Sequence, residues 1–119
     1  MYTYSQGQHT MSRDGAVVST TGHAGNGAGL NNPSLQYAHN LGPLPCGKYK
    51  ISAWGTHAQL GPISAPLVPQ MDVNGYAWLR GRGGFYIHGP EFSEGCIVQL
   101  EPDRLAMSQS GDCDLTVVE

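Results

Sequence analysis

Hydrophobic and polar side chains alternate over short stretches of this chain, a pattern typical of β-strands. Residues 48–54 are the clearest case, because Tyr49, Ile51 and Ala53 alternate with polar neighbours, as in a strand with one buried face. No stretch shows a convincing helical period before residue 101. The other predicted strands are short β-prone pieces at residues 2–5, 9–12, 16–21, 76–79, 85–88, 96–100 and 115–118.

Glycine and proline mark the turns between these stretches. Asp14-Gly15 is a dipeptide favoured in tight hairpins, so residues 1–21 are predicted to form a meander of edge strands. Residues 55–70 contain several glycines and prolines and are predicted to be a loop with at most a short edge strand. Pro102 has acidic neighbours and suits the first turn of a helix, which predicts one short helix over 102–108.

Residues 22–33 form a long glycine- and asparagine-rich segment. In a small domain such a loop is usually functional or a compact surface loop. It is a poor candidate for a phosphate cradle, because it lacks the GxxxxGK[ST] pattern and no helical pattern follows it. Taken together, the patterns predict one mainly β domain over residues 1–119, without internal repeats.

Length and composition narrow the class of protein. A chain of 119 residues supplies one modest core. Charged residues make up 13% and the net charge is −3, which argues against nucleic acid or an acidic membrane surface as partner. No apolar run is long enough for a membrane span. The N-terminal stretch MYTYSQGQHTMSRDG has neither a basic nor an apolar region, so we expect no ordinary secretory signal.

The candidate chemistry lies in residues 83–100, where His88 ends one predicted strand and Cys96 begins the next. A thiolate is a nucleophile, and a nearby imidazole can lower the thiol pKa, accept its proton and return it to a leaving group. Gly95 allows a sharp turn and leaves room for amide groups facing an oxyanion. Taken alone, the pair is weak evidence, and a buried thiol with a satisfied strand-end imidazole is the default interpretation. No metal site is expected, because zinc-ligand spacing is absent.

Four sequence blocks resemble a known family. "IHG" at 87–89 followed by "SEGCIV" at 93–98 resembles the signature of the YkuD-like L,D-transpeptidases, a His followed by Ser/Thr-His-Gly-Cys. "GNGAGLNNPSLQYAHNLGPLPCGKY" at 25–49 and "RGGFYIHG" at 82–89 are similar to a compact branch of that superfamily, antibacterial toxins exported by type VI secretion systems. The resemblance covers about residues 1–118 and implies a mainly β, L,D-transpeptidase-like β-sandwich with one short helix.

This resemblance implies roles for five residues of the motif. Cys96 would be the nucleophile and His88 the base, with the carbonyl of Gly89 orienting the imidazole. The amides of Gly95 and Cys96 would be the oxyanion donors. Ser93 would shape the loop or form a hydrogen bond near the thiol, although a simple turn residue is an equally good interpretation.

Substrate contacts are considered for three residues in or before the strand that ends in His88. Arg82 could bind a substrate carboxylate through its planar fork of donors, or be a solvated turn residue. Tyr86 and Trp78 could line the cleft, although such aromatic side chains more often belong to the core.

The function that the resemblance implies is attack on peptidoglycan stem tetrapeptides, as an L,D-carboxypeptidase, a D-amino-acid exchange enzyme or both. Such a toxin would be made in the cytoplasm, loaded onto a secretion-tube or spike component, and act in the periplasm of the target cell. A cognate immunity protein would be its partner, and no cofactor is implied. The alternative is a non-catalytic peptidoglycan- or partner-binding module. A papain-like enzyme is disfavoured, because there the Cys usually precedes the His.

Two departures from the family pattern bear on substrate preference. Glu94 stands where the motif often has a His, so a second imidazole beside the thiol is missing. The segment between His88 and Ser93 is shorter than in the larger enzymes, so we expect a lid built from it to be small or absent.

The remaining cysteines, Cys46 and Cys113, lie outside the proposed catalytic motif. A bond between them would close a loop of about 67 residues and leave Cys96 free, which suits an oxidising compartment. We therefore predict a Cys46–Cys113 disulfide. In the alternative, both are small hydrophobic side chains that stay reduced.

Overall fold

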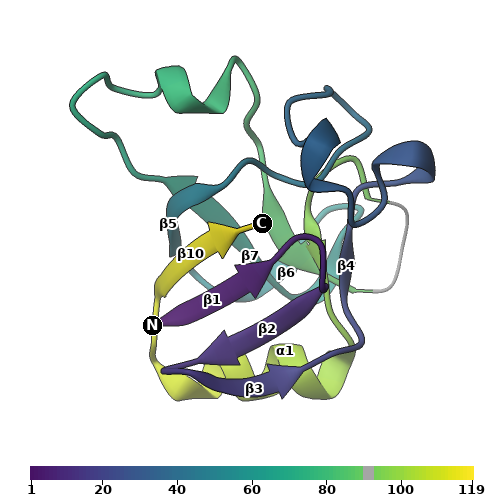
Figure 1. Cartoon of the computed structure of the whole chain (residues 1–119). Coiled ribbons are helices and arrows are strands. Elements are labelled where there is room, and N and C mark those ends of the chain that lie inside the picture. Colours follow the sequence, from purple (N-terminus) through teal and green to yellow (C-terminus); the bar gives the residue numbers. More distant parts are fainter. Residues whose placement is uncertain (90–92) are drawn as a thin grey trace.

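The computed structural model describes residues 1–89 and 93–119. Short strands spaced along the chain pair edge to edge in it (Figure 1). The predicted mainly β fold is confirmed. The described residues form β1 (Tyr2–Ser5), β2 (Thr10–Arg13), β3 (Ala16–Ser19), β4 (His23–Ala24), β5 (Gly47–Ile51), β6 (Gly55–His57), β7 (Gly61–Pro69), β8 (Tyr86–His88), β9 (Ile97–Val98) and β10 (Asp114–Val118), with 3-10 turns η1 (Gly27–Gly29), η2 (Pro33–Leu35) and η3 (Ala77–Leu79) and the helix α1 (Glu101–Ser110).

The described strands form one continuous sheet in the order β3-β2-β1-β10-β5-β7-β8-β9-β4, with β6 paired to β7. The hairpin of β2 and β3 turns at Asp14 and Gly15, which both have positive φ angles, as a tight primed turn requires. The pairs β1–β10 and β8–β9 are parallel, and the other pairs are antiparallel. Parallel neighbours cannot be joined by a two-residue hairpin, and the predicted motif lies in the chain between β8 and β9.

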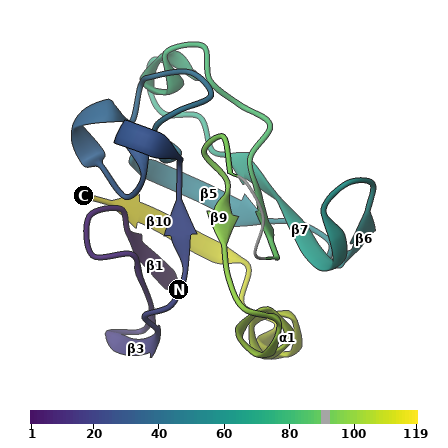
Figure 2. The same cartoon turned by 90° about the vertical axis from the view of Figure 1, so that its right-hand side faces the viewer.

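The core lies between two parts of this sheet. Figure 2 shows β9 in front of β5 and β10, and buried side chains from both parts belong to one hydrophobic cluster. One part of the sheet contributes Tyr4, Tyr49 and Leu115 to this cluster, and the other contributes Ile87 and Ile97. Because side chains alternate along each strand, these residues point into the cluster while their neighbours lie on the other face of the sheet. The site described below therefore rests on a packed, two-layered β-structure.

The helix α1 is two residues longer at its C-terminal end than the sequence predicts and begins one residue earlier. Pro102 lies in its first turn together with the acidic side chains of Glu101 and Asp103. The helix ends at its C-cap, Gly111, which has the left-handed conformation. Its buried side chains are Arg104 and Met107. At ten residues it is the longest helix among the described residues, and none of those helices could cross a membrane.

Two predictions on secondary structure are wrong. Residues 61–69, predicted as loop, form the nine-residue strand β7 in the middle of the sheet. Prolines are tolerated there because Pro62 and Pro69 lie near its ends and Pro66 lies where β7 changes its partner from β8 to β5. Residues 76–79, predicted as a strand, contain the turn η3.

The predicted Cys46–Cys113 disulfide is also wrong, because all three cysteines are free. In the register of β5 and β10, Asp114 lies opposite Lys50. Cys113 therefore lies beside Ile51, at the C-terminal end of β5, whereas Cys46 precedes its N-terminal end. Cys46 lies five residues away along β5, roughly 17 Å at the rise of a strand. A disulfide needs α-carbons within about 7 Å.

Candidate active site

The predicted nucleophile and base lie on two neighbouring parallel strands. His88 of β8 pairs with Val98 of β9, and the same register extended backward places Cys96 beside Tyr86. The Tyr86 amide donates a hydrogen bond to Sγ of Cys96 at 3.3 Å. Because side chains alternate along strands, His88 and Cys96 project from one face while Ile97 is fully buried in the core. The fold therefore brings the two predicted residues to one face.

The imidazole of His88 is buried and held in a defined orientation. Its Nδ1 lies 2.9 Å from the carbonyl oxygen of Gly89, the contact that the family resemblance implies. A carbonyl can only accept a hydrogen bond, so Nδ1 carries the proton. In the neutral ring, Nε2 is then the basic nitrogen, as a proton acceptor for a thiol requires.

The thiol of Cys96 is mostly buried, and this burial raises its pKa above the ordinary range. Hydrogen bonds from the Tyr86 amide and from its own amide lower the pKa, the carboxylate of Glu94 raises it, and the Arg82 charge lowers it. The net direction is upward, opposite to the lowered value expected for a preformed thiolate. Burial therefore favours the neutral thiol of Cys96, and a base that removes its proton would help to form the nucleophile.

Ser93 ties the turn before Cys96 together. Its buried hydroxyl donates to the Cys96 carbonyl at 2.6 Å and accepts from the amides of Gly95 at 3.1 Å and Gly25 at 3.2 Å. Asn26 donates its side-chain amide to the Ser93 carbonyl. The glycine-rich segment, predicted to be functional or a compact surface loop, thus holds the motif in place. The Gly95 amide already has Ser93 as partner here, whereas an oxyanion donor would point toward substrate.

Arg82 is almost fully buried and points into the protein. Its guanidinium donates four hydrogen bonds, at 2.6–3.0 Å, to backbone carbonyls of Gln36, Pro43, Gly42 and Glu94. Four of the five donors of its planar fork are therefore engaged. This geometry differs from the carboxylate-binding role implied by the resemblance, and supports a role in holding the turn that carries Cys96.

A glycine is required at position 95 by this packing. Gly95 has a φ of +141°, and a β-carbon there would lie 2.5 Å from Nη2 of Arg82 and 2.8 Å from Cε1 of Phe85. The Arg82 guanidinium also lies 5.2 Å from the centre of the Phe85 ring. Arg82, Phe85 and Gly95 therefore form one tightly packed support under the turn.

A cavity of about 270 Å³ opens beside Cys96. Its walls include Arg82 and Phe85, with Glu94 supplying a carboxylate. The loop residues His39 and Asn40 also line it. They lie in the family-like block at 25–49, but the sequence assigned them no role, because nothing in the local pattern relates them to the motif. The glycine-rich turn at residues 81–84 completes the wall and could have indicated a close approach of backbone to a ligand.

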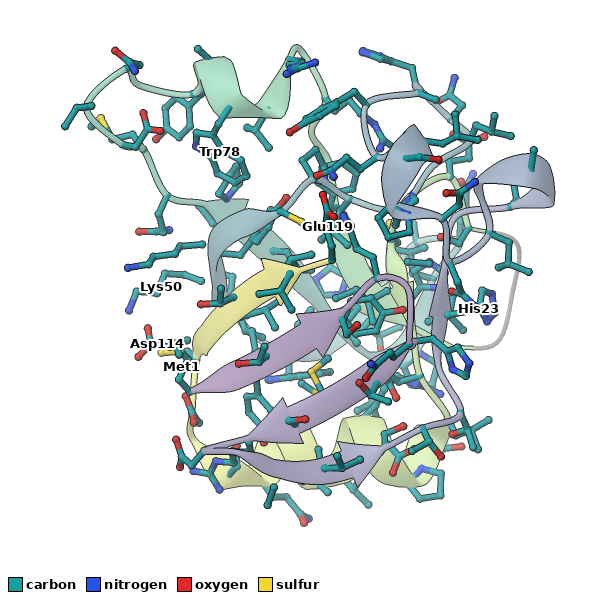
Figure 3. All side chains as sticks on the ribbon, in the orientation of Figure 1. Met1, His23, Lys50, Trp78, Asp114 and Glu119 are labelled. Carbon is teal, nitrogen blue, oxygen red and sulfur yellow. The ribbon has the colours of Figure 1, made fainter. Side chains whose placement is uncertain are left out.

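The two aromatic side chains considered for the cleft lie in different places. Tyr86 is half-buried beside Cys96, and its ring makes an edge contact with His57 at 5.4 Å. Trp78 belongs to η3, away from the motif (Figure 3), and its indole packs on Tyr49 of β5 and donates to the Gln70 carbonyl. Of the two, only Tyr86 lies beside Cys96.

The remaining site predictions concern metal ligands and the lid. Among residues 1–89 and 93–119, no group of three His, Cys, Asp or Glu side chains is close enough to hold a metal ion. The predicted small lid between His88 and Ser93 falls on residues 90–92, which lie outside the described residues.

Comparison with known proteins defines the class. The fold is similar to that of the solved structure of L,D-transpeptidase 1 from Mycobacterium tuberculosis, with a TM-score of 0.55 and 15% sequence identity. The match covers 99% of this chain and 60% of that one, so the chain spans about three fifths of the larger protein. It is thus an L,D-transpeptidase-like domain. Residues 19–111 match the Tlde1 domain, and the chain belongs to this family of L,D-transpeptidase-like type VI effectors. No curated protein matches it.

Proposed function

We propose that this domain is a cysteine enzyme that acts on peptidoglycan stem tetrapeptides at the L,D bond. The observation that carries the proposal is the placement of Cys96 and His88 on one face of β8 and β9, with the Gly89 carbonyl fixing the tautomer of His88. Membership of a peptidoglycan-acting effector family supports the substrate class.

In the proposed first half-reaction, Nε2 of His88 accepts the Cys96 proton as Sγ attacks the carbonyl at the L-centre of diaminopimelate. The tetrahedral intermediate collapses with cleavage of the bond to the terminal D-alanine, whose nitrogen receives the proton from His88. The product is a thioester on Cys96 and free D-alanine. Proton transfer at the moment of attack suits a thiol whose resting pKa is raised.

In the second half-reaction an acceptor attacks the thioester and His88 accepts its proton. Water gives a tripeptide, and a free D-amino acid gives an exchanged tetrapeptide, with the Cys96 thiol restored in both cases. Either outcome removes donors for cross-linking. We propose that the domain acts as an antibacterial toxin in the target-cell periplasm, delivered with a secretion-tube or spike component and neutralised in the producer by an immunity protein.

The direct test is mass spectrometry of muropeptides incubated with purified protein. Cys96→Ala is expected to abolish conversion while keeping the fold, because the change in volume is small. His88→Ala is expected to lower the rate by roughly 10²-fold or more, through loss of the base. His39→Ala is a matched control that removes an imidazole from the cavity wall without removing the proposed base.

Retained conversion by Cys96→Ala would reject the proposal. A wild-type protein that binds muropeptides without converting them would instead support the alternative, a non-catalytic module that retains the fold.

A further inference from the structure

A second buried arginine lies on the imidazole side of the site. Arg104 is in the first turns of α1 and is only 5% exposed. Its Nε donates to the Gln99 carbonyl at 3.1 Å, and Nη1 donates to the carbonyls of Pro62 at 2.7 Å and Ile63 at 3.0 Å. One side chain thus links the helix, the end of β9 and the start of β7.

Two paths lead from this guanidinium to His88. The Gln99 amide donates to the His88 carbonyl at 3.0 Å, so the residue that Arg104 holds also holds the His88 backbone. Nη2 of Arg104 lies 3.1 Å from the position that a β-carbon on Gly89 would take. The guanidinium therefore packs directly against the backbone of Gly89, whose carbonyl accepts the hydrogen bond from Nδ1 of His88.

The guanidinium is itself rigidly anchored. Ile63 has a φ of +54°, a left-handed conformation that is unfavourable for a β-branched side chain, and its carbonyl is one of the groups that Arg104 binds. The planar guanidinium spreads its donors over three nitrogens and so reaches three carbonyls, whereas a lysine ammonium carries all its donors on one nitrogen. The requirement here is therefore for an arginine and not only for a positive charge.

We propose that Arg104 is a positioning residue that keeps the Gly89 carbonyl on Nδ1 of His88, so that Nε2 remains the basic nitrogen. Its kinetic consequence rests on the proposed function, because His88 is the proposed base. Its structural consequence, the tautomer of His88, does not depend on that function.

The test compares Arg104→Met with Met107→Ala, which removes a buried side chain of the same helix that lines a hollow with Tyr2 and Met11. Ring ¹H–¹⁵N correlation spectra report the His88 tautomer, with the His88 signals assigned by their loss in His88→Gln. We expect Arg104→Met to lower the fraction with the proton on Nδ1, and Met107→Ala to leave it unchanged. Arg104→Lys, a second variant that is less disruptive, should shift the tautomer in the same direction.

The kinetic arm uses muropeptide conversion below the unfolding transition of each variant. Arg104→Met is expected to lower kcat by about tenfold or more with KM within about twofold, while Met107→Ala retains kcat. An unchanged tautomer in both Arg104 variants, or equal shifts in the Arg104 and Met107 variants, would overturn the proposal. If the wild type converts no muropeptide, the proposed function fails and the tautomer spectra alone decide the role of Arg104.

Discussion

Glu94 is the residue at which this chain departs from the family motif, and the structure gives its carboxylate a definite place. It lies on the wall of the cavity beside Cys96, and its negative charge raises the pKa of that thiol. A histidine at this position would not add a negative charge. The departure therefore changes the electrostatics of the nucleophile directly, in addition to any effect on substrate preference.

We expect Glu94→Gln to speed alkylation of Cys96 by iodoacetamide at pH 7 by roughly twofold to fivefold. Removal of the carboxylate lowers the thiol pKa and so increases the thiolate fraction. The measurement follows the Cys96 peptide by mass spectrometry, since Cys46 and Cys113 are free and also react. Glu101→Gln, on the exposed first turn of α1, is the control. An equal or slower rate in Glu94→Gln would contradict this electrostatic role.

The pH dependence of the same reaction follows from the direction of the pKa shift. Because burial raises the pKa of Cys96, its thiolate fraction is small at neutral pH and its alkylation rate should still be rising above pH 9. A rate that levels off below pH 8 would show instead a preformed thiolate–imidazolium pair with His88.

At the scale of elements, residues 93–96, which lead into β9, are held in place by a distant loop. Arg82 connects the Glu94 carbonyl with carbonyls of residues 36–43, and Ser93 connects the turn with the Gly25 amide. The parallel pairing of β8 and β9 sets which residues face the cleft, and these contacts set where the turn lies. A substitution that disturbs this support should therefore cost stability as well as activity.

Gly95→Ala is expected to lower the free energy of unfolding by about 2 kcal/mol or more, because it combines an unfavourable φ with close contacts to Arg82 and Phe85. Gly83→Ala is the matched control, since nothing lies within 4 Å of its β-carbon position, and it should change that free energy by no more than about 0.5 kcal/mol. Urea unfolding measures both. Similar values for the two variants would show that the turn can relax around a methyl group.

For the whole molecule, stability comes from the packed sheet without a cross-link. Cys46 and Cys113 lie at opposite ends of the β5–β10 pair, and both are free. An ion pair between Lys50 and Asp114 joins the two strands (Figure 3). One core cluster draws its members from both parts of the sheet. The chain therefore needs no disulfide to hold its ends in place.

We expect denatured, non-reduced protein to contain three titratable thiols per chain. A reducing agent should leave the unfolding temperature of the native protein unchanged, because there is no disulfide whose loss would enlarge the unfolded ensemble. Thiol titration together with calorimetry gives both results. A count of one thiol would restore the Cys46–Cys113 bond and contradict the strand register.

Features that depend on neighbours in the chain could be predicted from the sequence. Alternation of side chains at residues 48–54, the Asp14-Gly15 turn and Pro102 at the start of the helix are local, and each marks an element of the structure, although β5 ends at Ile51 and Ala53 is exposed. The His88 and Cys96 pair was also accessible, because a motif of fixed spacing carries it. Strand β7 could not be predicted, because its prolines locally indicate a loop. Pro66 is acceptable within the strand because β7 changes its pairing there from β8 to β5, which the local sequence does not reveal.

The amino-acid sequence by itself determined the mainly β class, the short helix and the two residues of the proposed catalytic pair, since periodicity and motif spacing are written along the chain. Only the tertiary structure decided the directions of Arg82 and Arg104, the cavity beside Cys96 and the separation of Cys46 from Cys113. The partners of a buried guanidinium are carbonyls from segments far away in the chain, and strand register sets distances that spacing in sequence does not contain.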